Sequence, residues 1–180
     1  MSTQSSTVTT STQSSAATYG RNAADRRNDM RDPTLDGARA ALETFYYAFN
    51  SRSLAVFAAV WADDELISLN NPLGGIIRGA HDIRDLYESI FEGPARVWVQ
   101  LHDIIEYASP EMVVFAGRET GEFTRDGQVV ELNIRTSRVF QYQPTVGWRQ
   151  AHHHGSIDDP DSLARYQRVV RGIMPVVDAG

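Results

Sequence analysis

The chain has 180 residues, a formal net charge of −6 and no cysteine, and the 17 residues counted as Lys or Arg are all arginines. The absence of lysine excludes Schiff-base chemistry and a phosphate-loop lysine. The absence of cysteine excludes thiolate catalysis, disulfides and cysteine-ligated zinc. Nucleic acids and anionic membranes bind basic surfaces, so the net acidity argues against both as partners.

The composition divides the chain into three parts. Residues 1–33 are rich in Ser, Thr, Arg, Asp and Asn with few large apolar side chains, which predicts a disordered tail. Residues 34–157 carry the periodic patterns of one folded domain, and residues 158–180 predict a C-terminal helix and tail. The sequence has no run of about 18 apolar residues and no secretory signal, so we expect a soluble, cytoplasmic protein.

The first half of the domain shows helical periodicity. Apolar residues spaced by three and four positions over 35–49 predict an amphipathic helix of about four turns, with Thr34 as its N-cap. Ser53 is expected to cap a second, shorter helix over 54–61. The remaining expected elements are a short strand at 65–70, an extended piece at 76–79 and a third helix from about 83 that ends at Gly93-Pro94.

The second half of the domain is rich in strands that are separated by turn residues. Consecutive hairpins of this kind imply an antiparallel sheet. Asp159-Pro160 then begins a final helix, whose basic C-terminal turn suits the helix dipole. Helices followed by a meander predict an α+β fold in which helices cover one face of a curved antiparallel sheet. The expected strands are 95–107, 112–124, 128–142 and 147–156.

The alternation of side chains along the strands indicates which residues face the interior. In the strand 128–142 the even positions are mostly apolar, and Arg138 is among them. If the loop 125–127 closes the preceding hairpin, Arg118 lies opposite Ile134 and points to the same side. Two guanidinium groups are therefore expected to share a largely apolar concavity.

A guanidinium group in such a concavity needs partners, because it carries a permanent charge and five donors. Thr120 and Glu122 lie on the same predicted strand face as Arg118. Two interpretations stay open. Arg118 and Arg138 pair with Glu122 or with a helix carboxylate as an internal network, or they form a pocket that receives an anionic ligand.

The last strand carries three consecutive histidines. A four-residue loop at 143–146 places His153 beside Thr136, on the inner face with the arginines. Because neighbours in a strand point to opposite faces, at most two of the histidines converge, and no metal site is predicted. The outer face is expected to serve as an oligomer interface, and it carries Trp148, Gln150, His152 and His154.

Two segments of the second half resemble a known superfamily. The sequence has TSRVF at 136–140 and WRQAHHHGS at 148–156. Both are similar to motifs of SnoaL-like domains in the nuclear transport factor 2-like superfamily, and of the association domain of calcium/calmodulin-dependent protein kinase II. The resemblance covers about residues 35–157. It implies a cone-shaped α+β barrel whose bent sheet wraps around the N-terminal helices, a pocket at the wide end and a homodimer formed through the outer sheet face.

The resemblance also implies roles for individual residues. Arg118 and Arg138 fall on arginines that line the pocket of the kinase association domain. Enzymes of the superfamily, such as ketosteroid isomerases, polyketide cyclases and dehydratases, use an inward base and a hydrogen-bond donor. The base falls on His153 and the donor on Tyr46 or Tyr47 of the first helix.

We therefore predict a protein that binds a small carboxylate or other polar small molecule in a conical pocket, with no cofactor and no metal. One alternative is an isomerase, cyclase or dehydratase that transfers a proton next to a carbonyl, with His153 as base and Tyr46 as donor. Another is a non-catalytic oligomerisation module. The predicted ligand-binding residues are Arg118, Arg138, Thr120, Glu122 and Thr136.

Overall fold

The structure, a computed structural model, describes residues 9–172. Its helices are η1 (Asp29–Arg31), α1 (Leu35–Ser51), α2 (Leu54–Val60), α3 (Ala80–Glu92) and α4 (Pro160–Arg171). Its strands are β1 (Ser11–Ser15), β2 (Ser68–Asn70), β3 (Ile76–Arg78), β4 (Arg96–Ala108), β5 (Met112–Arg125), β6 (Gln128–Gln143) and β7 (Gly147–Ile157). No helix within residues 9–172 is both long and apolar enough to cross a membrane.

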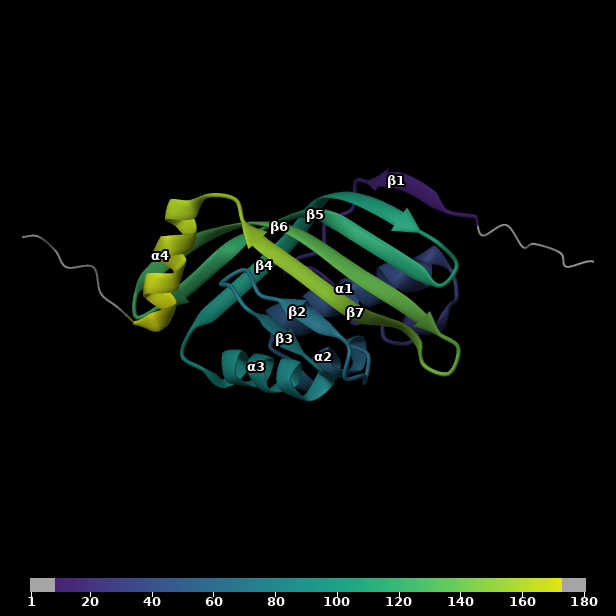
Figure 1. Ribbon diagram of the computed structural model, residues 1–180, viewed down its shortest axis with the longest axis horizontal. Helices are drawn as coiled ribbons and strands as arrows, with labels where there is room; N and C mark the ends of the chain where they lie inside the picture. The colour runs from purple at the N-terminus through teal and green to yellow at the C-terminus, as the bar shows by residue number, and fades with distance from the viewer. Residues whose placement is uncertain (1–8, 173–180) are drawn as a thin grey trace, which may run out of the picture.

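The strands form one curved sheet that is covered on one side by α1, α2 and α3 (Figure 1). Their order is β1-β4-β5-β6-β7-β2-β3, so β1 and β3 are the two edges. The long hairpins from β4 to β7 are antiparallel as predicted, whereas β2 runs parallel to β7. The α+β class is thus confirmed, but the expected barrel is wrong because the sheet does not close.

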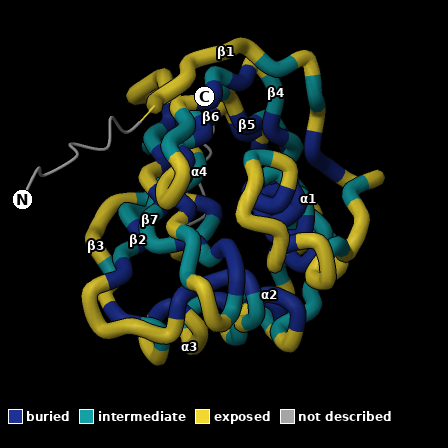
Figure 2. Tube along the Cα trace, turned by 90° about the vertical axis from the view of Figure 1, so that its right-hand side faces the viewer, coloured by how far each residue is buried: buried dark blue, intermediate teal, exposed yellow. Residues whose placement is uncertain are grey.

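The core lies between the apolar faces of the helices and the sheet. Helix α1 is almost entirely buried on its sheet side (Figure 2), where Leu42 and Phe45 are at most 1% exposed. Phe57 of α2 packs on Tyr87 of α3 with ring centres 4.0 Å apart. These contacts follow the spacing by three and four that the sequence shows, because that spacing puts apolar side chains on one side of a helix.

The β5–β6 hairpin turns through two residues, not through the three that were expected. Arg125 pairs with Gln128, and Asp126 and Gly127 between them have φ values of 50° and 76°. Positive φ at both central residues is typical of the turn whose twist matches that of the two strands. The Asp-Gly sequence suits this turn because both residues tolerate the left-handed conformation.

This shorter turn shifts the pairing of β5 by one residue and so exchanges its two faces. The predicted pairing of Arg118 with Ile134 is wrong: Glu119 lies opposite Ile134, and Arg118 lies opposite Arg135. Glu119 is therefore buried at 2% exposure, and the side chain of Arg118 is 53% exposed on the outer face.

The β6–β7 hairpin also differs from the expectation. Its loop has three residues (144–146), because Gln143 pairs with Gly147. Farther along, a β-bulge leaves Ala151 without a partner in the β6–β7 ladder. A bulge adds one residue to a strand and changes which side chains face inward beyond it.

The bulge explains the distribution of the side chains of β7. Trp148 and Gln150, which were expected on the outer face, are buried at 1% and 0% exposure. His153 is buried, as expected. His152 is half-buried and His154 is exposed, so these two lie on the outer face, as predicted. Without the bulge, Trp148 and His153 would lie on opposite faces of the strand.

Residues 9–33, for which the composition predicts a disordered tail, pack against the domain in the structure. β1 pairs antiparallel with β4 and forms one edge of the sheet. Gln13 of β1 donates to Glu106 at 2.8 Å, and Arg39 of α1 donates to both oxygens of the same carboxylate at 3.0 and 2.7 Å. The prediction for residues 1–8 lies outside the described residues.

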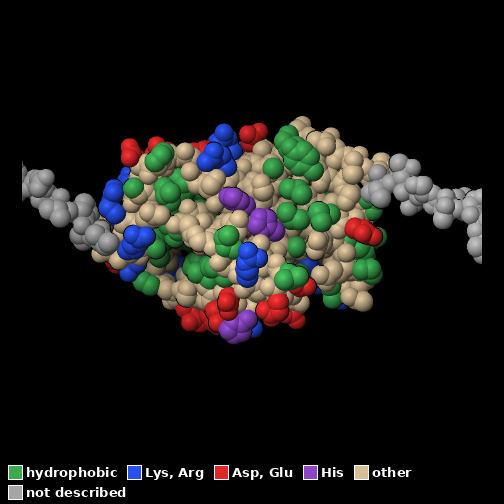
Figure 3. Space-filling model, viewed as in Figure 1, with side chains coloured by type: hydrophobic (Ala, Val, Ile, Leu, Met, Phe, Trp, Pro, Cys, Tyr) green, Lys and Arg blue, Asp and Glu red, His purple; other side chains and the backbone are tan. Residues whose placement is uncertain are grey.

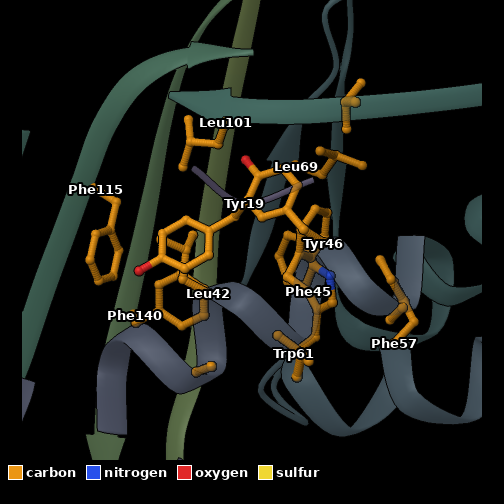
Figure 4. Close-up of a cluster of buried hydrophobic side chains, with 14 of the residues drawn as sticks. Tyr19, Leu42, Phe45, Tyr46, Phe57, Trp61, Leu69, Leu101, Phe115 and Phe140 are labelled. Carbon is orange, nitrogen blue, oxygen red and sulfur yellow. The ribbon is translucent and has the colours of Figure 1, made fainter. Parts of the chain in front are cut away.

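The segment after β1 contributes to the core itself. Tyr19 is 9% exposed, forms an antiparallel bridge with Leu101 and stacks on Tyr46, with ring centres 6.4 Å apart (Figure 4). Met30 is 1% exposed. Composition suggests disorder here because these apolar residues are few, but each of them is buried by the folded domain.

Candidate functional site

An apolar cavity of about 390 Å³ lies between the helices and the sheet. Phe45 and Phe49 of α1 and Tyr87 of α3 form one wall, and Phe123 and Leu132 of the β5–β6 hairpin form another. Cavities of about 300–1,000 Å³ with apolar walls and a few polar groups are typical of small-molecule sites.

Glu119, Arg138 and His153, from β5, β6 and β7, lie together in the lining of this cavity and are called its floor; Asn71, Ser89 and Arg125 are polar residues elsewhere in the lining. Nη2 of Arg138 lies 2.7 Å from Oε1 of Glu119, and the two side chains are 2% and 3% exposed. Removing either partner would leave the other charge buried and uncompensated, which is energetically costly. The pair is therefore a fixed structural feature of the floor.

Two further side chains hold this ion pair in place. The hydroxyl of Tyr46 donates to Glu119 at 2.5 Å and accepts from Nε of Arg138 at 3.0 Å. Nη1 of Arg138 donates to Gln150 at 3.2 Å, and its guanidinium lies 3.7 Å above the ring centre of Phe45. The network links α1 to three strands, so the orientation of the guanidinium is determined by the core.

The floor is electrically balanced. Burial raises the pKa of Tyr46 well above its usual 10.0, so its hydroxyl stays protonated. Burial by itself lowers the pKa of Arg138, but Tyr46 and Glu119 favour the charged form, and the net pKa is raised. The positive charge of Arg138 is thus compensated by the carboxylate of Glu119.

His153 is the third member of the floor and is 4% exposed. Its Nε2 lies 2.9 Å from the hydroxyl of Thr136, which donates to the carbonyl of His154 at 3.3 Å. Because that hydroxyl hydrogen is engaged, the network assigns the imidazole hydrogen to Nε2. Nδ1 is buried with no hydrogen-bond partner among residues 9–172. Burial, and to a lesser extent Arg138, lowers the pKa of His153 well below 6.5.

Helix α4 covers one side of the cavity at the end of the sheet away from β1 (Figure 1). Tyr166 of α4 lines the cavity and packs edge-on against Phe123 with ring centres 5.1 Å apart. Burial raises the pKa of Tyr166 to about 12. Gln167 donates to the carbonyl of Leu73 at 2.9 Å, so α4 is tied to the loop between β2 and β3.

Four of the predicted site residues come together at the floor. Arg138 and His153 line the cavity, and Tyr46 and Thr136 hydrogen-bond to them. Tyr46 donates to Glu119, and the cavity wall does not include it. Its hydroxyl contacts Glu119 and Arg138, so Tyr46 orients the ion pair of the floor.

The other three predicted residues lie away from the cavity. Arg118 reaches Asp158 at 2.8 Å on the outer face, and Glu122 accepts from the indole of Trp98 at 2.9 Å. Thr120 lies between Arg118 and Glu122 at an alternate position of β5 and therefore on the same outer face. The three-residue loop that the sequence predicts would place all three on the inner face, whereas the two-residue turn places them on the outer one.

The sequence interpretation missed two residues that bind Arg138: Glu119, which lines the cavity, and Gln150, which accepts from Nη1 of Arg138. A signal for Glu119 was present in β5, where the large apolar residues Val113, Phe115 and Phe123 occupy odd positions. Glu119 has the same parity, so alternation within β5 alone predicts it to be buried.

Comparison with known proteins places the chain among relatives with this fold. The SnoaL-like domain model matches residues 38–160. The chain is similar to a protein from Thiobacillus denitrificans provisionally named a calcium/calmodulin-dependent protein kinase type II association domain. The two share 28% identity over 67% of this chain and 94% of that one, with a TM-score of 0.53.

Two further solved structures share the fold at lower identity. A nuclear transport factor 2-like superfamily protein from Salmonella enterica is 17% identical over 73% of this chain and 93% of its own, with a TM-score of 0.63. A ketosteroid isomerase-like protein from Erwinia carotovora is 20% identical over 70% of this chain and 97% of its own, with a TM-score of 0.59. Comparison with curated sequences gives no match.

The family match covers most of α1, all of α2 and α3, and the long strands that form the cavity and its floor, and it ends where α4 begins. The structural relatives share this arrangement of helices on a bent sheet. The chain therefore belongs to the SnoaL-like domain family.

Proposed function

We propose that this protein binds a small, largely apolar molecule that presents a neutral oxygen, such as a carbonyl or hydroxyl, to the floor of the cavity. The observation that supports the proposal is an apolar cavity of about 390 Å³ that ends at a charge-balanced polar floor. Apolar walls provide affinity, and a few fixed polar groups provide orientation.

The charge balance of the floor favours a neutral ligand over the carboxylate that the sequence suggested. Arg138 already has Glu119 as its counter-ion at 2.7 Å. A ligand carboxylate would add a second negative charge close to Glu119, and burying an uncompensated charge is costly. Three hydrogen bonds from Arg138 to protein groups leave two of its five N–H groups to donate to a neutral oxygen.

Two probes with the same ring system test this preference: 2-acetylnaphthalene, a neutral ketone, and 2-naphthoate, a carboxylate. We expect the ketone to raise the melting temperature and the carboxylate to do so much less. A ligand at a hundredfold excess over its Kd stabilises a protein by about 2.7 kcal/mol, which a thermal scan detects readily. Equal or stronger binding of the carboxylate would contradict the neutral-ligand proposal.

A matched pair of tryptophan variants tests where the probe binds. Leu86→Trp adds bulk to the helix α3 side of the cavity and is expected to abolish the effect of the ketone. Leu66→Trp makes the same change at a side chain that is 85% exposed, and binding should persist. If neither probe binds to the parent protein, or if Leu86→Trp binds normally, the cavity is not the ligand site.

We propose proton transfer next to a carbonyl as a second candidate function. The specific observation in its favour is Nδ1 of His153, which is buried at the floor with no partner among residues 9–172. Its depressed pKa keeps the imidazole neutral with a lone pair on Nδ1, as a base requires. Nδ1 would take a proton from the carbon next to the carbonyl, and Arg138 would donate to the developing enolate oxygen.

Hydrogen exchange of a bound ketone tests this second candidate. In D₂O, the protein is expected to accelerate deuterium incorporation into the methyl group of 2-acetylnaphthalene, measured by proton NMR. His153→Gln should remove the acceleration, and His81→Gln, at a side chain 79% exposed, should preserve it. Acceleration that persists in His153→Gln would rule out this base, whereas binding without acceleration would leave a binding protein only.

We further propose that two copies associate through the outer face of β4–β6, as the family resemblance suggested. An apolar row crosses this face, because Tyr107 lies opposite Val114 and Val114 lies opposite Val139. Val114→Arg is expected to give a monomer in light scattering, and Val129→Arg, at the start of β6, to leave the dimer intact. A monomeric parent protein would exclude this interface, as well as the alternative of an oligomerisation module.

A further inference from the structure

The outer face of β7 carries a pair of histidines outside the cavity. His152 and His154 point to the same side of the strand, and their ring centres are 6.5 Å apart with an interplanar angle of 85°. Histidine side chains (purple) lie together over β7 near the middle of the face in Figure 3. Two imidazoles bound to one metal at about 2.0–2.1 Å, at tetrahedral or cis square-planar angles, have ring centres about 4.5–5.2 Å apart. Rotation of the two side chains must therefore bring the rings together by roughly 1.5 Å.

The first imidazole is oriented by its neighbouring strand. Nδ1 of His152 lies 3.1 Å from the carbonyl oxygen of Ser68 and 2.7 Å from its hydroxyl. A carbonyl can only accept, so this contact assigns the hydrogen to Nδ1 and leaves the lone pair on Nε2. Metal-binding histidines are held in the same way, by a carbonyl or carboxylate that accepts from the other ring nitrogen.

The second imidazole has an equivalent neighbour. Nδ1 of His154 lies 3.5 Å from the side-chain amide of Asn70, the residue beside it in the parallel β2–β7 pair. An amide can present either its oxygen or its nitrogen there, so Asn70 can accept from Nδ1 and leave Nε2 of His154 free. Both histidines thus have a second-layer partner on β2.

No positively charged side chain lies beside the histidine pair on the neighbouring strands, so none would repel a bound cation. The residues beside the two histidines on β2 and β6 are Ser68, Asn70, Ser137 and Val139, none of them charged. No third His, Asp, Glu or Cys joins the pair within residues 9–172, so two protein ligands are available.

We infer that His152 and His154 form a two-imidazole site for a late first-row divalent ion, with water at the remaining coordination positions. Imidazole nitrogen suits Cu²⁺, Ni²⁺ and Zn²⁺, and affinity at a given site is highest for Cu²⁺. The site lies on the solvent-facing side of β7, away from the cavity floor. The inference is therefore independent of the proposed ligand and of the proposed reaction.

Calorimetric titration of the full chain with Cu²⁺, and separately with Zn²⁺, tests the site. We expect one ion per chain for Cu²⁺ and weaker binding for Zn²⁺. His154→Gln should weaken Cu²⁺ binding at least about tenfold, since loss of a second-layer partner alone costs about 10–100-fold. His81→Gln removes an exposed histidine elsewhere and should leave binding unchanged.

His152→Gln is expected to weaken binding to the same extent as His154→Gln. It also removes the contact with Ser68, so circular dichroism without metal is needed to verify its fold. His154 is exposed, and its variant therefore decides the question if His152→Gln does not fold. Absence of saturable Cu²⁺ binding, or binding that is unchanged in His154→Gln, would overturn the inference.

Discussion

Arg118 and Arg135 lie directly opposite each other in the β5–β6 ladder and share one carboxylate. Asp158, which follows β7, lies 2.8 Å from Nη1 of Arg118 and 2.7 Å from Nε of Arg135. The shared carboxylate compensates two like charges on neighbouring strands, and it fixes the start of the segment that leads into α4. This arrangement replaces the anion pocket that the sequence suggested for Arg118.

Asp158→Asn is expected to lower the free energy of unfolding only slightly. All three side chains are more than a third exposed, and surface ion pairs contribute about 0–1 kcal/mol. Urea unfolding should show a loss of at most about 1 kcal/mol, and the ketone should bind to the variant as before. A large loss of stability or of binding would mean that the outer arginines matter for the cavity.

Glu119→Gln is expected to destabilise the protein strongly. The substitution keeps the shape of the side chain but leaves Arg138 buried without its counter-ion, which costs about 3–5 kcal/mol. The matched control is Glu122→Gln on the outer face of the same strand, which should change the free energy of unfolding by less than about 1 kcal/mol. Similar urea midpoints for the two variants would contradict the assigned register.

His153 is expected to make the protein less stable in mild acid. Its pKa in the folded state is below 6.5 because it is buried, so the unfolded chain binds its proton more readily. Stability is therefore fully present above about pH 6.5 and declines as the pH falls below it, by up to about 1.4 kcal/mol per pH unit.

Melting temperatures between pH 7.5 and 5 measure this effect. His153→Gln should show a shallower decline than the parent protein, whereas His81→Gln should follow the parent curve. Parallel curves for the parent and His153→Gln would show that the proton on His153 does not govern the acid response.

Tyr19→Ala is expected to destabilise the domain by about 3 kcal/mol, as loss of a buried aromatic side chain does. Tyr19 is 9% exposed and stacks on Tyr46, which holds the ion pair of the floor. Tyr107→Ala, at a side chain that is 48% exposed, is the control and should cost less than about 1 kcal/mol. Equal effects would indicate that the N-terminal segment does not pack as described.

The helices α1–α4 and the four consecutive antiparallel strands β4–β7 were predictable from local patterns, whereas β1 and the parallel pairing of β2 with β7 were not. The apolar spacing of α1, the glycine after α3 and the Asp-Pro start of α4 are signals that act within a few residues. Helix α4 begins at Pro160 with Asp159 as its N-cap, as the sequence indicated. Such local signals hold because they do not depend on the length of a turn elsewhere.

The faces of the strands were less predictable, since each depends on turn length. A single residue in the β5–β6 turn decided whether Arg118 or Glu119 faced the cavity. The bulge at Ala151 has no equally clear sequence signal. The burial of Tyr19 and Met30 could not be predicted from the composition of their segment, which is mostly polar. Their burial depends on a few apolar contacts with distant parts of the chain.

The bulge in β7 has a consequence for how the cavity can change. Three histidines follow one another, so an imidazole reaches the cavity whichever way the strand is offset. With the bulge at Ala151, only His153 does so. A regular strand would turn His152 and His154 inward and His153 outward. If the bulge lay beyond His154, two imidazoles would face the cavity in place of one, without any change in amino-acid composition.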